Sequence, residues 1–146
     1  MPIKSRIRTV EDFPQKGIMF RDVTSLIGDP LGLRLCVDDF AKYYKDTEFD
    51  LVVGIDSRGF IFGGALAYLL QKGLIPVRKK GKLPAETVEE EYELEYGTDT
   101  LEIHKDAIKP GQKVLIIDDL IATGGTAVAA INLVRKLGGN VIGFAA

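Results

Sequence analysis

The sequence has few of the residues that build disulfides and metal sites. Its 146 residues include one cysteine, Cys36, and one histidine, His104. A single cysteine excludes an intrachain disulfide, and one residue of each kind excludes a Cys-rich or His-based metal cluster. Because Cys36 falls within a helical pattern, we expect it to be a buried structural thiol, packed as a small apolar side chain.

Long apolar runs and a strong charge of one sign are also missing. No stretch approaches the roughly 18 uninterrupted apolar residues of a membrane span, and residues 1–10 lack the apolar run of a signal peptide. The formal net charge is −2, so the composition indicates no general affinity for nucleic acid or anionic membranes. We therefore predict a cytoplasmic protein with neither nucleic acid nor membrane among its partners.

The composition that is present suits one globular domain. Hydrophobic residues make up 46% of the chain and charged residues 27%, and the length is typical of a single domain. We find no internal repeat and no low-complexity linker, so we predict one domain over residues 1–146.

Strand and helix patterns alternate along most of the chain. Apolar runs predict strands at residues 50–55, 74–77, 114–117 and 141–146. Helical spacing predicts helices after the N-cap pair Asp29-Pro30, over residues 60–71 with Gly73 as the stop, and over residues 127–137. This alternation predicts an α/β fold with an open, mainly parallel sheet flanked by helices. Ligands of such folds bind beyond the carboxyl ends of the strands.

A polar segment breaks the alternation of strand and helix. Residues 91–96 alternate between glutamates on one face and Tyr or Leu on the other, residues 97–99 form a turn, and residues 100–104 alternate again. We predict a β-hairpin that projects from the body of the domain.

The loop Ala122–Thr126 connects an expected strand to an expected helix. Backbone N–H groups at a helix N-terminus are unpaired and partly positive, glycines allow close approach, and threonine hydroxyls add donors, which together make a phosphate cradle. No lysine follows the glycines, so this is not a Walker A loop. The alternative is an ordinary turn that uses glycine for its geometry and threonine as a cap.

The adjacent acids Asp118 and Asp119 end the apolar run before this loop. Neighbouring carboxylates at a strand end need hydrogen-bond donors or a cation. The two hydroxyls of a ribose beside a bound phosphate would supply such donors. A Walker B acid is the competing use, but a Walker A loop to complete it is absent.

The stretch VLIIDDLIATGGT, residues 114–126, resembles the phosphoribosyl-diphosphate binding motif of type I phosphoribosyltransferases. Three more stretches are similar to the adenine phosphoribosyltransferase family: FPQKGIMFRD at 13–22, GIDSRGF at 54–60 and ELEYGTDTLEIH at 93–104. The resemblance implies the type I phosphoribosyltransferase fold and transfer of a phosphoribosyl group from phosphoribosyl diphosphate to adenine. AMP and diphosphate would be the products, Mg²⁺ would accompany the sugar diphosphate without an assigned protein ligand, and the enzyme would be a homodimer.

The resemblance also implies roles for the residues of the strand-end loops. The 5′-phosphate would be held by Ala122, Thr123, Gly124, Gly125 and Thr126, and the ribose hydroxyls by Asp118 and Asp119. The diphosphate loop would be Asp56, Ser57, Arg58 and Gly59, where Arg58 suits a leaving diphosphate because its guanidinium binds phosphate in a bidentate manner. The alternative for Arg58 is a surface salt bridge.

A basic cluster and the hairpin complete the implied site. Lys79 and Lys82 resemble the family's diphosphate contacts, and Arg78 would reach a neighbouring subunit's site; a solvated basic turn is the alternative. The hairpin resembles the family's catalytic lid, in which Glu95, followed by Tyr96, matches the acid/base glutamate. The alternative for the hairpin is a solvent-facing acidic strand.

Base recognition has its own implied residues. Met19 and Arg21 would read the adenine edge through backbone groups, while Phe20 and Leu120 would sandwich its ring, unless they are ordinary core residues. Relatives specific for hypoxanthine and guanine have an acid where this chain has Ala122, which favours adenine.

The family resemblance also implies a further strand region and a helix beyond Ala146, so we expect the sequence to lack the C-terminal segment. Two other functions stay open. One is a regulatory protein that senses phosphoribosyl diphosphate without catalysis, and the other is a transferase for another base, such as xanthine or a pyrimidine. The retained Glu95-Tyr96 pair and the absence of an added domain favour the enzyme.

Overall fold

The computed structural model describes residues 8–11, 19–22, 24–94, 96–118 and 124–146. They form two compact units, Met1–Tyr44 and Lys45–Ala146. In the described part of the chain, every helix is too short or too polar to cross a membrane.

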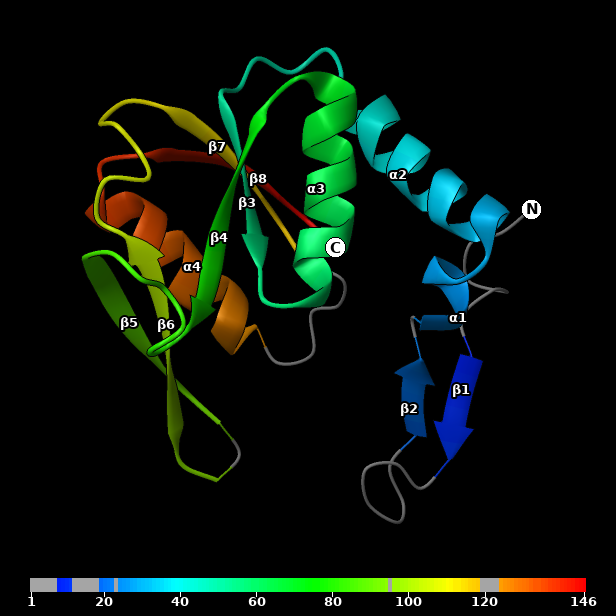
Figure 1. Ribbon diagram of the computed structural model, residues 1–146, viewed down its shortest axis with the longest axis horizontal. Coiled ribbons are helices and arrows are strands. Elements are labelled where there is room, and N and C mark those ends of the chain that lie inside the picture. The colour runs from blue at the N-terminus through cyan, green and yellow to red at the C-terminus, as the bar shows by residue number, and fades with distance from the viewer. Residues whose placement is uncertain (1–7, 12–18, 23, 95, 119–123) are drawn as a thin grey trace. The chain divides into compact units, whose positions relative to one another are not determined.

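The first unit contains a short hairpin and two helices (Figure 1). Strand β1 (Arg8–Glu11) pairs antiparallel with β2 (Met19–Asp22), and α1 (Thr24–Ile27) and α2 (Pro30–Tyr44) follow. The Asp29 carboxylate accepts a hydrogen bond from the Leu31 N–H at 3.1 Å, which confirms the predicted helix start. Cys36 is buried as predicted, and burial, followed by the charge of Asp39, raises the pKa of its thiol to about 11.

The second unit is built on one six-stranded sheet in the order β5-β6-β4-β3-β7-β8. Its strands are β3 (Leu51–Ile55), β4 (Gly73–Lys79), β5 (Thr87–Glu93), β6 (Thr98–His104), β7 (Lys113–Ile117) and β8 (Asn140–Ala145). Strands β4, β3, β7 and β8 are parallel, whereas β6 pairs antiparallel with both β4 and β5. The predicted open, mainly parallel sheet is confirmed.

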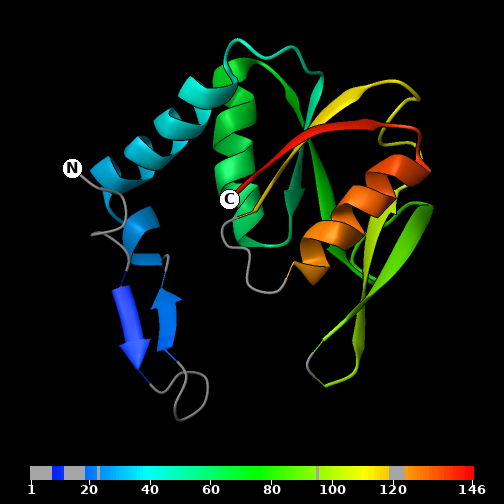
Figure 2. The same ribbon diagram turned by 180° about the vertical axis from the view of Figure 1, so that it is seen from behind.

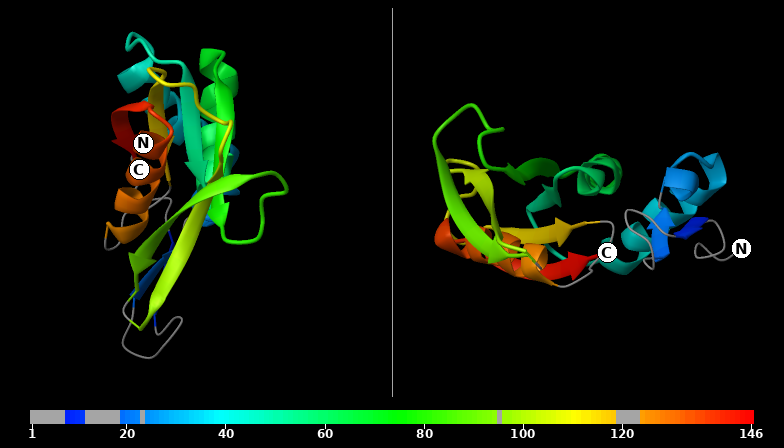
Figure 3. Two further views of the ribbon diagram at one scale, coloured as in Figure 1. Left: turned by 90° about the vertical axis from the view of Figure 1, so that its left-hand side faces the viewer. Right: turned by 90° about the horizontal axis from the view of Figure 1, so that it is seen from below.

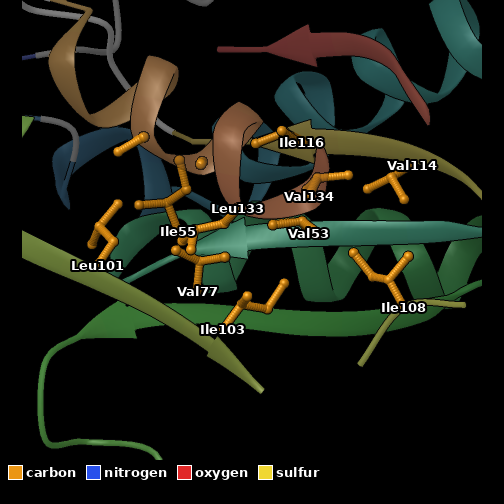
Figure 4. Packing of buried hydrophobic residues seen from close by; sticks show 12 residues of the cluster. Val53, Ile55, Val77, Leu101, Ile103, Ile108, Val114, Ile116, Leu133 and Val134 are labelled. Carbon is orange, nitrogen blue, oxygen red and sulfur yellow. The ribbon is translucent and has the colours of Figure 1, made fainter. Parts of the chain in front are cut away.

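Helices α3 (Arg58–Leu70) and α4 (Gly125–Lys136) cover opposite faces of this sheet (Figures 1 and 2). The alternation of strand side chains explains the arrangement. Val53 and Ile116 belong to the cluster that packs with Leu133 of α4 (Figure 4), whereas Val52 and Ile117 lie beside Gly63 of α3. Strands buried on both faces are apolar throughout, which is why β3 and β7 appear in the sequence as unbroken apolar runs.

Two boundaries differ from the sequence predictions. Helix α3 ends at Leu70, one residue before the predicted end, because Gln71 adopts a left-handed conformation with φ at 59°, and the predicted stop Gly73 is the first residue of β4. Strand β4 in turn continues to Lys79, so Arg78 and Lys79 lie in a strand and only the residues after them form a turn. The predicted glycine stop is wrong, because the residue with the left-handed conformation at the end of α3 is a glutamine.

The predicted hairpin exists, with a different turn (Figure 3). Its strands pair from Thr87↔His104 to Glu93↔Thr98, and the Leu94 N–H donates to the Gly97 carbonyl across the turn. Tyr96 therefore belongs to the turn and is 88% exposed, and Thr98 and Asp99 belong to β6. Strand β6 pairs with β4 only at residues 101 and 102, so the base of the hairpin joins the sheet and its tip extends away.

Candidate active site

The predicted diphosphate loop and the acid that ends β7 lie side by side. Strands β3 and β7 are neighbours with Gly54 opposite Ile117, so the residues after them leave the same edge of the sheet. A Cβ atom on Gly59 would come within 2.8 Å of the Ile117 carbonyl oxygen and 3.4 Å of an Asp118 carboxylate oxygen. Only glycine permits this approach, which brings Asp118 against the loop.

The diphosphate loop itself is short and turns directly into a helix. The peptide bond between Asp56 and Ser57 is cis, Ser57 occupies the N-cap position of α3 without a side-chain capping hydrogen bond, and Arg58 is the first helical residue. The Asp56 N–H donates to the Val77 carbonyl at 2.9 Å, which fixes the loop to the end of β4. Arg58 is half-buried in this position.

The predicted phosphate cradle begins α4. Gly124 is the N-cap, with φ at 85°, a conformation that favours glycine, and the helix starts at Gly125. A Cβ atom on Gly124 would have no described heavy atom within 4 Å beyond its chain neighbours, so the space in front of it is open. N–H groups of the first helical turn lack intrahelical partners and suit an anion there.

A pocket of about 550 Å³ separates the hairpin from the start of α4. Its walls come from β5 and α4: Glu90, Glu91, Tyr92, Glu93, Gly124, Gly125, Val128, Ala129 and Asn132. The predicted phosphate cradle thus opens into a pocket whose other wall is the predicted lid.

Polar contacts hold the hairpin against α4. The Glu90 carboxylate accepts hydrogen bonds from Lys136 Nζ at 2.7 Å and from Asn132 Nδ2 at 2.9 Å. Lys136 Nζ also donates to the Glu89 carbonyl oxygen at 2.6 Å. The hydrogen bond from Lys136, then that from Asn132, lowers the pKa of Glu90.

A second polar network joins the hairpin to β4. Asp99 accepts from Lys79 Nζ at 3.2 Å and from the Tyr92 hydroxyl at 3.4 Å. The Thr100 N–H, followed by Lys79, lowers the pKa of Asp99, and the hydrogen bond to Asp99 raises the pKa of Lys79. Burial, then the charge of Asp99, raises the pKa of Tyr92, and a side-chain hydrogen bond between Tyr92 and Thr126 opposes the rise.

The remaining cations of the basic cluster lie in different surroundings. Arg78 Nε donates to Asp56 at 3.1 Å, and its guanidinium carbon lies 5.8 Å from the centre of the Phe60 ring. Lys82 is exposed on the turn after β4. Within this chain Arg78 therefore contacts the diphosphate loop, and its reach into a neighbouring subunit stays a prediction.

Comparison with known proteins agrees with this geometry. A model of the phosphoribosyl transferase domain family matches residues 25–146. The adenine phosphoribosyltransferase of Chlorobaculum tepidum is 64% identical, over 99% of this chain and 83% of that protein. This chain belongs to the adenine phosphoribosyltransferase family.

Solved structures of the family share the fold. The adenine phosphoribosyltransferase of Thermoanaerobacter pseudethanolicus superposes with a TM-score of 0.93 at 53% identity, over 97% of this chain and 83% of that one. The Saccharomyces cerevisiae enzyme, solved with adenine and an imino-altritol bisphosphate, gives a TM-score of 0.89 at 40% identity, over 97% and 86%. The type I phosphoribosyltransferase fold predicted from the sequence is confirmed.

Several residues that the adenine phosphoribosyltransferase resemblance singled out lie outside the described structure. Met19, Phe20 and Arg21 occupy β2, where only the backbone is described. Outside the described residues are Glu95, Asp119, Leu120, Ala122 and Thr123. Their roles stay predictions.

Sequence reasoning missed the acids that hold the basic cluster. The sequence pattern predicts a turn at Asp99, and it assigns no role to Glu102. The sequence does hold a sign that Glu102 is buried, because Glu102 lies between Leu101 and Ile103, which are both core residues. An acid in that setting must find hydrogen-bond donors.

Proposed function

We propose that this protein transfers the 5-phosphoribosyl group from phosphoribosyl diphosphate to adenine, giving AMP and diphosphate in purine salvage. The observation that carries the proposal is the contact of Gly59 with Ile117 and Asp118. It joins the loop suited to diphosphate with the acid suited to ribose, and the strand that this acid ends, β7, is followed in the chain by α4, whose N-terminus suits phosphate. Membership of the family supplies the base and the reaction.

We assign the parts of the substrate to the loops around this contact. The N–H groups and hydroxyls of residues 122–126 hold the 5′-phosphate, and Asp118 and Asp119 accept hydrogen bonds from the ribose hydroxyls. Residues 56–59 hold the diphosphate, together with Lys79 and Lys82. The start of α4 and the adjoining pocket support the first assignment.

In the reaction, the bond between the anomeric carbon and the diphosphate oxygen breaks, and a bond from that carbon to a purine nitrogen forms. The sugar passes through an oxocarbenium-like state, and the charge that develops on the leaving diphosphate is stabilised by Arg58. Glu95 takes the proton that the purine nitrogen loses. Because the protein forms no covalent bond to substrate, orientation and electrostatic stabilisation supply the catalysis.

The hairpin acts as the lid of this site in our proposal. It already forms one wall of the pocket in front of Gly124 and Gly125. The turn that carries Tyr96 is exposed and is held by the Leu94–Gly97 hydrogen bond, so its movement needs little loss of buried contact. Closure would bring Glu95 to the base and exclude water.

The resemblance implies Mg²⁺, and the donors present suit an ion that arrives with the sugar diphosphate. Among the described residues, groups of three or more His, Cys, Asp or Glu side chains that could hold a metal are absent. Magnesium is commonly bound through one or two carboxylates plus substrate phosphates, and Asp118 lies at the loop in question. When bound, the ion would neutralise charge on the diphosphate.

Adenine specificity rests on residues whose side chains the structure does not describe. Phe20 and Leu120 would sandwich the ring, a stacking contact of about 1–3 kcal/mol, and backbone groups of Met19 and Arg21 would read its edge. A purine with a protonated ring nitrogen needs an acid at position 122. Because this chain has Ala122 there, adenine is favoured. The adenine complex of the yeast relative supports this choice of base.

A direct assay tests the proposal. The purified protein is mixed with phosphoribosyl diphosphate, Mg²⁺ and adenine, and AMP is measured by chromatography, with hypoxanthine, guanine and xanthine in parallel. We expect AMP to form and the other bases to react far more slowly. Binding of phosphoribosyl diphosphate without any turnover would instead support the regulatory alternative, and preference for another base would overturn the specificity.

The homodimer and the cytoplasmic location are further proposals. Arg78 is partly exposed near the end of β4 and pairs with Asp56. In the proposed dimer, Arg78 leaves this partner and reaches the site of the second subunit. Sedimentation velocity should give a species of twice the mass of one chain.

A further inference from the structure

Glu102 is the one acidic or basic side chain that is buried in the described part of the chain. It is 8% exposed and lies in β6 between Leu101 and Ile103, which belong to the hydrophobic core. Strand alternation puts Glu102 on the face opposite to theirs. Its register partners are Arg78 on β4 and Glu89 on β5, so it sits where the hairpin joins the main sheet.

Both carboxylate oxygens of Glu102 accept a short hydrogen bond. One accepts from the Gly81 backbone N–H and the other from the Thr87 hydroxyl, each at 2.6 Å. The Thr87 hydroxyl, then the Gly81 N–H, lowers the pKa of this carboxyl. Two donors on separate segments therefore converge on one ionised group, an arrangement that a neutral side chain of the same size cannot reproduce.

The Gly81 bond fixes the turn that follows β4. Gly81 has φ at 87°, the Lys80 N–H donates to the Thr100 carbonyl at 3.1 Å, and the Lys82 N–H donates to the Lys79 carbonyl at 3.3 Å. A carboxylate that holds the N–H of the central residue ties this turn to β6. Thr87 ties the start of β5 to the same group.

This turn carries the lysines that the proposed function assigns to diphosphate. Lys79, the last residue of β4, leads into it and Lys82 ends it, and Arg78 just before Lys79 contacts Asp56 of the diphosphate loop. If the turn moved, the backbones of both lysines would move relative to that loop. Such a movement matters because a displacement of about 1 Å at a positioning element can reduce activity about a hundredfold.

We propose that Glu102 is a positioning residue for diphosphate: by accepting from Gly81 and Thr87, it holds the 79–82 turn at the distance from the diphosphate loop that Lys79 and Lys82 need. The inference rests on the proposed function, since the role of the two lysines belongs to it. Glu102 does not touch substrate, so its removal affects ligands that include the diphosphate and spares those that do not.

The test compares Glu102→Gln with a matched control, Glu89→Gln. The Glu89→Gln substitution also removes a carboxylate beside this turn. The Glu89 carboxylate pairs with Lys80 at 3.4 Å, but both side chains are exposed, and the substitution leaves the backbone hydrogen bonds of the turn intact. Glutamine at position 102 keeps the shape and cannot accept both hydrogen bonds. We measure KM for phosphoribosyl diphosphate and for adenine, kcat, and the affinities for diphosphate and AMP by calorimetry.

We expect Glu102→Gln to raise KM for phosphoribosyl diphosphate and weaken diphosphate binding roughly tenfold, the effect of one unmade buried hydrogen bond. The KM for adenine and the affinity for AMP should change by less than about twofold, within the range of substitutions away from a contact. Glu89→Gln should match the wild type in all of these. Thr87→Val should also weaken diphosphate binding selectively, by a smaller factor. Thr87→Ser keeps the hydroxyl and should restore the wild-type affinity.

A purely structural role gives a different result. Glu102→Gln would then lower the melting temperature or the active fraction while the KM for phosphoribosyl diphosphate equalled that of Glu89→Gln, which overturns the inference. If Glu102→Gln does not fold, Thr87→Val decides: unchanged diphosphate affinity overturns the inference. Wild-type protein that binds diphosphate but forms no AMP contradicts the proposed function, while the diphosphate affinities still test Glu102.

Discussion

The parallel strands β3 and β7 and the hairpin β5–β6 are held by different forces. Val52, Val53 and Ile116 are completely buried, and helices pack on both faces of their strands. The hairpin reaches the same core through Leu101 and Ile103 of β6, and it is held in addition by charged pairs, Glu90 with Lys136 and Asp99 with Lys79. One region is fixed by apolar packing on both faces, and the other combines apolar packing from β6 with hydrogen bonds that water can replace.

The difference matches what each region has to do. The loops proposed to hold phosphate and diphosphate follow strands whose packing is dense, so the strand ends from which they leave keep their separation without a ligand. A lid has to open for each turnover and is drawn from elements with few buried contacts. Changes in the packed region should therefore reduce stability, and changes in the hairpin should reduce turnover.

The largest expected effect belongs to the hairpin. Glu95→Ala should lower kcat by about 10²–10⁴-fold, the usual contribution of a general acid/base group, and leave phosphoribosyl diphosphate affinity and the melting temperature nearly unchanged. Steady-state kinetics and calorimetry measure this. Glu86→Ala, exposed just before β5 and outside the pocket lining, is the control. Equal losses in turnover and affinity would remove Glu95 from the chemistry.

The packed region should show the opposite pattern. Leu133→Ala removes a side chain of α4 that is fully buried against β3 and β7 and should lower the free energy of unfolding by about 2–5 kcal/mol. Urea denaturation measures it, with Val128→Ala, exposed on the same helix, as a control that changes stability by less than about 0.5 kcal/mol. Similar losses in both variants would show that α4 is not packed as described.

Gly59→Ala tests the contact between the proposed diphosphate loop and the end of β7, both in the packed region. Its new Cβ would lie 2.8 Å from the Ile117 carbonyl oxygen, so the loop must shift, and we expect about 1–3 kcal/mol lower stability and weaker diphosphate binding. Gly64→Ala on the same helix has its nearest neighbour at 3.9 Å, and should gain up to about 1 kcal/mol from helix propensity. Identical behaviour of the two variants in unfolding and calorimetry would argue against the close approach.

The smallest effect concerns the attachment of the hairpin to α4. Glu90→Gln should lower the free energy of unfolding by less than about 1 kcal/mol, because the pair is partly exposed and screened. The folded state lowers the pKa of Glu90, so its contribution is present above the ordinary value of about 4.5 and is lost as the pH falls through the lowered pKa. Urea denaturation at pH 7 and pH 3.5 should show the difference from wild type shrinking in acid, and a constant difference would contradict the ionic contact.

The sequence predicted the packed region better than the hairpin. Unbroken apolar runs such as residues 114–117 identify buried parallel strands, and acids or glycines directly after them identify the ligand edge. Alternation also predicted that residues 91–104 form a hairpin, because its period assigns faces. These predictions depend only on neighbouring residues.

The rest depends on pairings between distant residues. Alternation does not say that β6 joins β4 at residues 101 and 102, nor that Glu102 meets Gly81 across 21 positions of sequence. The left-handed conformation at Gln71 likewise carries no composition signal, since glycine two residues later was the stronger stop. Polar partners therefore became visible only with the register of the strands.

A crystal structure with bound AMP tests the central claim most directly. We predict the 5′-phosphate within hydrogen-bond distance of the backbone N–H groups of Gly124, Gly125 and Thr126, with the ribose hydroxyls at Asp118 and Asp119. A nucleotide bound elsewhere, or the start of α4 closed against protein in the presence of AMP, would contradict it.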